Sequence, residues 1–130
     1  MSFIKFKPIA SHFRFYTSIS SNQLDNTTLQ FIDDNERIVL AFKSTRDLAI
    51  FTDKRIILID KKGIRGFRKS IYAIEYDSIS SYTLNIRNID SIIEIITDSS
   101  HRLKMNFSKP IPLDEVHKVY QHITDCVVKK

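Results

Sequence analysis

Apolar runs of strand length alternate with short polar segments along most of this chain. Between residues 38 and 107 these runs are rich in isoleucine and other strand-forming residues, and turn residues separate them. After Pro112 the apolar positions recur at steps of three and four, which is the period of a helix. The pattern predicts strands at 38–42, 48–52, 55–60, 67–74, 79–86, 89–97 and 101–107.

The order of these segments predicts a mainly β fold of the α+β class. Because short turns join consecutive strands, the seven strands should pair antiparallel in a meander. A short helical pattern begins at Ser21, and the amphipathic helix after Pro112 should cap one open end or edge of the sheet. We expect an N-terminal arm at residues 1–21 and one domain at residues 22–130, a length that suits a single core.

The central hairpin carries the most specific motif. An Arg-Asp pair and a Phe-Thr-x-Lys-Arg run precede Asp-x-x-Gly-x-x-Gly, and this order resembles the signature of the small bacterial PH-domain family. The signature residues here are Arg46, Asp47, Lys54, Arg55, Asp60, Gly63 and Gly66. The resemblance extends over about residues 22–128, and it departs from the family pattern at residues 85–90.

The resemblance implies a pleckstrin-homology-like barrel of seven antiparallel strands with a C-terminal helix. Members of the family are known as cytoplasmic proteins that assemble into cyclic oligomers, with no assigned enzymatic activity. The resemblance therefore implies a self-assembling protein-interaction module of otherwise unknown role.

The predicted strands are apolar on both faces, whereas a half-buried strand alternates apolar and polar residues. A single small barrel has one interior, so we expect the extra apolar side chains to form a contact between copies of the chain. Each large apolar side chain left in water loses about 1.5–3 kcal/mol of the stabilisation that burial would provide. The alternative is that the N-terminal arm and the first helix cover them. The interface candidates are Leu48, Ile50, Phe51, Ile56, Leu58, Ile93 and Ile95.

The first twenty residues interleave aromatic and basic side chains, and no acidic residue precedes Asp25. Such an arm can lie on a membrane interface or a partner, or it can fold back on its own domain or a sister subunit. We favour folding back. Its basic residues also interrupt any apolar stretch that would serve as a secretion signal.

Composition adds few constraints. An apolar content of 42% with 27% charged residues is typical of a soluble globular protein. The single cysteine, Cys126, fits a reducing compartment, so we expect a cytoplasmic protein. The net charge of +5 permits contact with an acidic surface.

Basic residues from separate loops should meet at the open end of the barrel. There they can bind a phosphorylated head group or another anion, although a solvated basic rim is the simpler interpretation. Membrane contact of this kind would be weak. The candidates for anion binding are Lys43, Lys61, Lys62, Arg65 and Arg102.

No catalytic motif is present in the sequence, and we expect neither enzymatic activity nor a cofactor. His122 and Cys126 lie one helical turn apart but lack an evident third metal ligand. Nucleic-acid binding is a further alternative, and no recognised motif supports it.

Overall fold

The structure, a computed structural model, describes residues 10–62 and 68–128. The strands are β1 (Ala10–Phe15), β2 (Thr17–Ile19), β3 (Ile38–Lys43), β4 (Asp47–Thr52), β5 (Arg55–Lys62), β6 (Arg68–Glu75), β7 (Ile79–Ile86), β8 (Asp90–Thr97) and β9 (Arg102–Ser108). The helices are η1 (Ser21–Gln23), α1 (Asn26–Leu29), η2 (Tyr76–Ser78) and α2 (Leu113–Val128), of which η1 and η2 are 3-10 turns.

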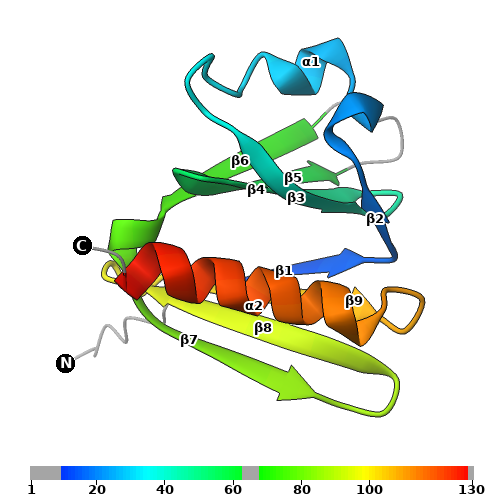
Figure 1. Cartoon of the computed structure of the whole chain (residues 1–130), viewed down its shortest axis with the longest axis vertical. Helices are drawn as coiled ribbons and strands as arrows, with labels where there is room; N and C mark the ends of the chain where they lie inside the picture. Colours follow the sequence, from blue (N-terminus) through cyan, green and yellow to red (C-terminus); the bar gives the residue numbers. More distant parts are fainter. Residues whose placement is uncertain (1–9, 63–67, 129–130) are drawn as a thin grey trace, which may run out of the picture.

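Two sheets face each other across the core, with α2 lying beside the lower sheet in Figure 1. One sheet has the order β1-β9-β8-β7 and the other has the order β2-β3-β4-β5-β6. The prediction of a mainly β fold with a C-terminal helix is confirmed. The prediction of one barrel of seven antiparallel strands was wrong, because the described residues form nine strands in two sheets that do not close into a barrel.

The two additional strands come from the predicted N-terminal arm. β1 pairs in parallel with β9, and β2 pairs antiparallel with β3. Phe13 and Phe15 are buried, and the ring of Phe15 lies 5.5 Å from that of Phe107. Residues 10–19 therefore lie within the sheets, although the sequence placed the start of the domain at residue 22. Residues 1–9 of the predicted arm lie outside the described residues.

Both faces of the central strands β4 and β5 are buried within one chain. Phe51, Ile56 and Leu58 belong to the core between the sheets. Ile50 and Ile57 lie in a second apolar cluster on the outer face of the same strands. Successive residues of a strand point to opposite faces, so each strand contributes to both clusters.

This burial overturns the exposure on which the predicted interface rested. Six of the seven candidates have relative exposures of 0%: Ile50, Phe51, Ile56, Leu58, Ile93 and Ile95. The seventh, Leu48, is partly buried against the outer cluster. Their apolar character is therefore explained without a second copy.

The segment that connects β2 to β3 covers the outer face. Leu24 is buried against this outer cluster, and Ile32 packs at its edge. Asp25 fixes the entry into α1, because its carboxylate accepts a hydrogen bond from the Thr28 amide at 2.8 Å. The segment thus has the covering role that the alternative assigned to the first helix.

The C-terminal helix α2 packs through one stripe onto the sheet core. Val116, Val119 and Ile123 are its buried residues. Asp114 and Glu115 lie in its first turn, where negative charge is favourable. Within residues 10–62 and 68–128, no helix has the length and apolar character that crossing a bilayer requires.

Candidate functional site

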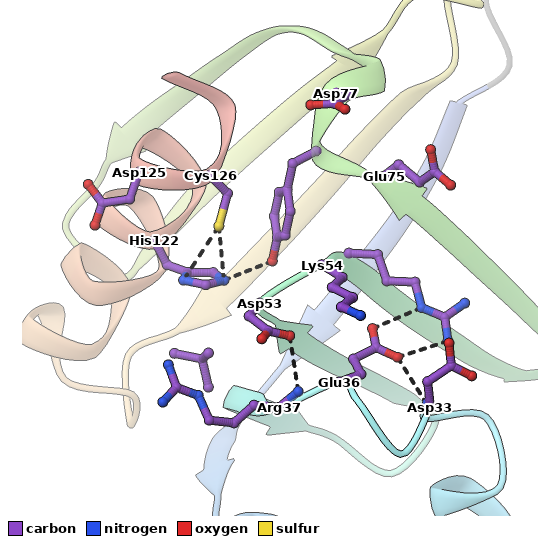
Figure 2. A pocket seen from close by; sticks show the side chains of 13 residues that line it. Asp33, Glu36, Arg37, Asp53, Lys54, Glu75, Asp77, His122, Asp125 and Cys126 are labelled. Atoms are coloured by element: carbon purple, nitrogen blue, oxygen red, sulfur yellow. Dashed lines mark hydrogen bonds and ion pairs between the residues drawn. The ribbon is translucent and has the colours of Figure 1, made fainter. Parts of the chain in front are cut away.

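A groove of about 630 Å³ lies where the β4–β5 turn, η2 and the end of α2 meet. Figure 2 shows its side chains, which come from segments far apart in the sequence. The lining residues are Asp33, Glu36, Arg37, Val39, Asp53, Lys54, Arg55, Glu75, Tyr76, Asp77, His122, Asp125 and Cys126. The groove is larger than four other cavities on the described residues, which have volumes of about 480, 300, 160 and 140 Å³.

Glu36 and Arg55 form a two-point ion pair at the base of this groove. Arg55 Nε donates to Glu36 Oε2 at 2.9 Å, and Arg55 Nη2 donates to Oε1 at 3.0 Å. Burial opposes ionisation of Glu36, but hydrogen bonds from Arg55 and Thr52 outweigh it and lower the pKa of the carboxyl. The same hydrogen bond raises the pKa of Arg55. Both groups are therefore charged at neutral pH.

Thr52 explains why the chain turns sharply here. Its hydroxyl oxygen accepts hydrogen bonds from the backbone amides of Lys54 and Arg55, at 3.1 and 3.0 Å. Local side-chain to backbone bonds of this kind stabilise a tight turn. The turn places Asp53 and Lys54 on the rim, and Asp53 accepts a hydrogen bond from the Arg37 amide at 3.0 Å.

Tyr76 and His122 form the wall between η2 and α2. The Tyr76 hydroxyl donates to the carbonyl of Thr52 at 2.7 Å and lies 2.8 Å from His122 Nε2. Burial raises the pKa of Tyr76, so the phenol is neutral. His122 Nε2 also lies 2.8 Å from the Thr52 carbonyl oxygen. In the tautomer with hydrogen on Nε2, this nitrogen donates a hydrogen bond to that carbonyl. The groove walls are thus held together by polar contacts.

The His122–Cys126 pair considered for metal binding is also at this wall. Cys126 Sγ lies 3.7 Å from His122 Nε2. Across residues 10–62 and 68–128 the structure contains no cluster of three or more histidine, cysteine or acidic side chains placed to hold a metal ion.

The structure separates the cations that the sequence placed at one open end. The amide of Lys61 donates to the carbonyl of Arg46 at 3.0 Å, and Lys43 ends β3 beside the same turn. Arg102 begins β9 opposite Ala10, at the other end of β1. Six residues of strand separate these two ends by about 16 Å. The Lys62 side chain and the whole of Arg65 lie outside the described residues.

Acidic groups accompany the cations at the Lys43 end. At this end Arg46 lies 3.7 Å from Asp60. The cation at the opposite end, Arg102, also has an acidic neighbour, because it lies 3.9 Å from Glu94. Asp47 accepts a hydrogen bond from the amide of Arg14 at 2.8 Å. Burial and then the nearby Asp60 raise the pKa of Asp47 despite that hydrogen bond. The described residues of this end therefore form a mixed-charge surface.

Most of the signature residues have structural roles where the structure describes them. Arg55 holds Glu36, Asp60 lies beside Arg46, and the exposed Lys54 occupies the tip of the turn. Gly63 and Gly66 lie outside the described residues. Sequence reasoning missed the groove. Glu36 stood in a polar segment, and no spacing indicated that it would meet an arginine nineteen residues later.

Comparison with known proteins agrees with this fold. A 30% identical relative, matched over 108 residues, is the uncharacterized protein YjqA of Bacillus subtilis (strain 168), with coverage of 79% of this chain and 86% of the relative. A protein of the DUF1696 family with a pleckstrin-homology domain, from Shewanella loihica PV-4, has a similar crystal structure. Its TM-score is 0.74 at 24% identity, with coverage of 85% of this chain and 95% of that one.

A pleckstrin homology domain from Shewanella amazonensis SB2B matches with a TM-score of 0.61 at 28% identity, covering 78% of this chain and 83% of that structure. The model of the bacterial PH domain family matches residues 9–127, which include β1 and β2 as well as the predicted domain. This chain therefore belongs to the bacterial PH domain family.

Proposed function

We propose that this protein is a non-enzymatic interaction module that assembles with itself, with β6 of one copy pairing with β7 of the next. One observation carries the proposal: β6 and β7 are eight-residue strands, and among the described residues no strand pairs with the outer edge of either one. Such an edge presents free backbone N–H and C=O groups to another strand. Each hydrogen bond formed there contributes about 0.5–1.5 kcal/mol.

The side chains of β7 and of the middle of β6 support pairing, and the charged residues of β6 (Arg68, Lys69 and Glu75) lie toward its two ends. β7 has no charged residue, although charge is a common means of preventing edge-to-edge contact. Ile86 at its end is 56% exposed. On β6, Ile71 is 39% exposed, because the apolar cover over the outer face ends at β5. These two strands therefore present apolar surface beside free backbone groups.

The arrangement would generate a ring. A contact between two different edges is heterologous, and repeated heterologous contacts close into a cyclic oligomer when the rotation allows it. Cyclic assembly is also what the family resemblance implies. A cytoplasmic location belongs to the same proposal and rests on the single cysteine.

Anion or membrane binding by the basic end is the second candidate, and the described contacts support it less. Arg46 has Asp60 as a partner, and Asp47 lies in the same turn. Arg102 lies at the other end of β1. Lys43 and Lys61 remain exposed cations that can contribute weak attraction to an acidic surface.

Light scattering of the full chain tests assembly. The proposal predicts a mass that is a multiple of the 15.2 kDa chain. Ile71→Lys or Thr83→Lys, each adding a charge beside one edge, should shift the mass toward a single chain. Thr27→Lys places the same charge on the exposed surface of α1 and should leave the mass unchanged. A single-chain mass for the wild type would refute the proposal.

A further inference from the structure

Three elements of the fold meet at the backbone carbonyl of Thr52, where β4 ends. The Tyr76 hydroxyl in η2 donates its hydrogen to this carbonyl at 2.7 Å, and His122 Nε2 in α2 lies 2.8 Å from the same oxygen. The same nitrogen also lies 2.8 Å from the Tyr76 oxygen. Because the one hydrogen of the phenol is used at Thr52, both oxygens can only accept a hydrogen bond from Nε2.

These contacts fix the position of the hydrogen on the His122 ring. A neutral imidazole has a hydrogen on one nitrogen and a lone pair on the other. If the lone pair were on Nε2, the single phenol hydrogen would have to serve both Nε2 and the Thr52 carbonyl, which would leave two close acceptors with no hydrogen between them. With the hydrogen on Nε2, every close contact is a hydrogen bond. The lone pair of the ring is therefore on Nδ1.

The thiol of Cys126 lies against this same ring. Cys126 follows His122 by four residues on α2, so the two side chains share one face of the helix. Its Sγ lies 3.9 Å from Nδ1 and 3.7 Å from Nε2. Since the hydrogen of Nε2 is used at Thr52, Nδ1 is the nitrogen that can accept the hydrogen of the thiol. A nucleophile, a base and a group that orients the base are thus in contact, which is the arrangement that activates nucleophilic side chains.

Cys126 can be reached from solvent. It is half-buried, and both it and His122 line the groove of about 630 Å³. Figure 2 shows the two side chains together at the wall of this groove. A cavity of this volume has room for a small organic molecule. The thiolate is the reactive form of cysteine and attacks the sulfur of a disulfide. The thiol of Cys126 therefore has both access to a reagent and an acceptor for its proton.

We propose that Cys126 is a site of reversible thiolation by low-molecular-weight disulfides, with His122 as the base. The thiol hydrogen passes to Nδ1, and the Cys126 thiolate attacks one sulfur of the disulfide. A new sulfur–sulfur bond joins Cys126 to one half of the reagent as the bond within the reagent breaks. The other half leaves as a thiolate and takes the proton back from Nδ1, so the reagent supplies the oxidation and is itself reduced to a thiol. This inference is independent of assembly through β6 and β7, because it requires a single chain.

The rate of mixed-disulfide formation with bis(2-hydroxyethyl) disulfide, an uncharged reagent, tests the proposal. Intact-mass spectrometry of the full chain follows the adduct on its single cysteine. The matched control is Cys126→Ser with Thr27→Cys, which moves the thiol to the exposed surface of α1. We expect the native thiol to react about tenfold faster near neutral pH, where an ordinary thiol is only slightly ionised. An equal or faster rate for the thiol at position 27 would overturn the proposal.

The dependence of this rate on pH separates a base from a structural contact. His122→Gln keeps an amide hydrogen for the Thr52 carbonyl and removes the lone pair of Nδ1. Its rate should be about tenfold below the native rate near neutral pH and should approach the native rate at about pH 10, where a thiol ionises without a base. Tyr76→Phe keeps both thiol and base, and should stay within about twofold of the native rate throughout. A loss in His122→Gln that is the same at both pH values, or an equal loss in Tyr76→Phe, would contradict the role of His122.

Discussion

The carboxylate of Glu36 and the guanidinium of Arg55 meet through two hydrogen bonds between a loop and the first residue of β5. The Glu36 side chain is 1% exposed and that of Arg55 is 29% exposed. Arg55 Nη2 also donates to the carbonyl of Phe31 at 2.7 Å. One arginine therefore holds the covering segment against the sheet at two positions.

Glu36→Gln should lower the free energy of unfolding by about 2–3 kcal/mol, because it leaves Arg55 without its charged partner. Chemical denaturation measures this change. Lys118→Gln removes one partner of an exposed helix pair with Glu115 and should cost less than about 1 kcal/mol. Equal losses in the two variants would contradict a structural role for the Glu36 pair.

The cover over the outer sheet face should depend on Leu24. This side chain is 8% exposed and packs on Ile50, Ile57 and Ile59. Leu24→Ala should destabilise the fold by about 2–3 kcal/mol and increase the binding of a hydrophobic dye. Leu29→Ala, at a residue that is 38% exposed, should have a much smaller effect on both. If dye binding is the same for both variants, the face is not covered in this way.

β1 should be indispensable to the domain. Phe15 is 0% exposed and lies between the sheets, so Phe15→Ala should cost about 3–5 kcal/mol on denaturation. Tyr16→Ala is the adjacent control, because Tyr16 is 46% exposed. A small loss at Phe15 would mean that the strand is a detachable arm, with the domain beginning near residue 22.

Asp90 and Asp47 should affect stability with opposite dependence on pH. The hydrogen bond from Arg87 lowers the pKa of Asp90 to about 2 from its ordinary 3.8. Its stabilising contribution is therefore complete above about pH 4 and is lost as the pH falls toward 2. Asp90→Asn should be destabilising at neutral pH, and the difference from wild type should shrink over this interval in pH-dependent denaturation.

Burial raises the pKa of Asp47, so ionisation of this carboxyl disfavours the folded state. Its unfavourable contribution is present at neutral pH and diminishes as the pH falls through the folded pKa. Asp47→Asn keeps an acceptor for the Arg14 amide and should become less favourable, relative to wild type, as the pH falls. The same trend with pH for both variants would contradict this assignment.

Strand positions and fold family could be predicted from the sequence, because each strand carries local signals of its own. Asp53 and Lys54 marked the β4–β5 turn, and the period of three and four marked α2. β1 could not be predicted as a strand of the core, since its pairing with β9 is parallel and joins residues more than ninety positions apart. No local pattern encodes such a partner.

Strands with apolar residues on both faces were interpreted as a contact between copies of the chain, because a sequence does not show which segment covers a sheet face. Leu24 lies in a short, mostly polar segment, yet it is buried on the sheet. The groove was missed for a related reason. His122, Tyr76 and Glu36 lie far apart in the chain, and only the crossing of α2 over the β4–β5 turn brings them together.

Amide hydrogen exchange in β6 and β7, followed as protein concentration rises, tests edge-to-edge assembly most directly. The outward amides of these strands pair with no other strand in the part of the chain that the structure describes, and pairing with a second copy should slow their exchange. We predict slowing in both strands over the concentration range in which the mass increases. Unchanged exchange in β6 and β7 while the mass increases would show that the copies meet elsewhere.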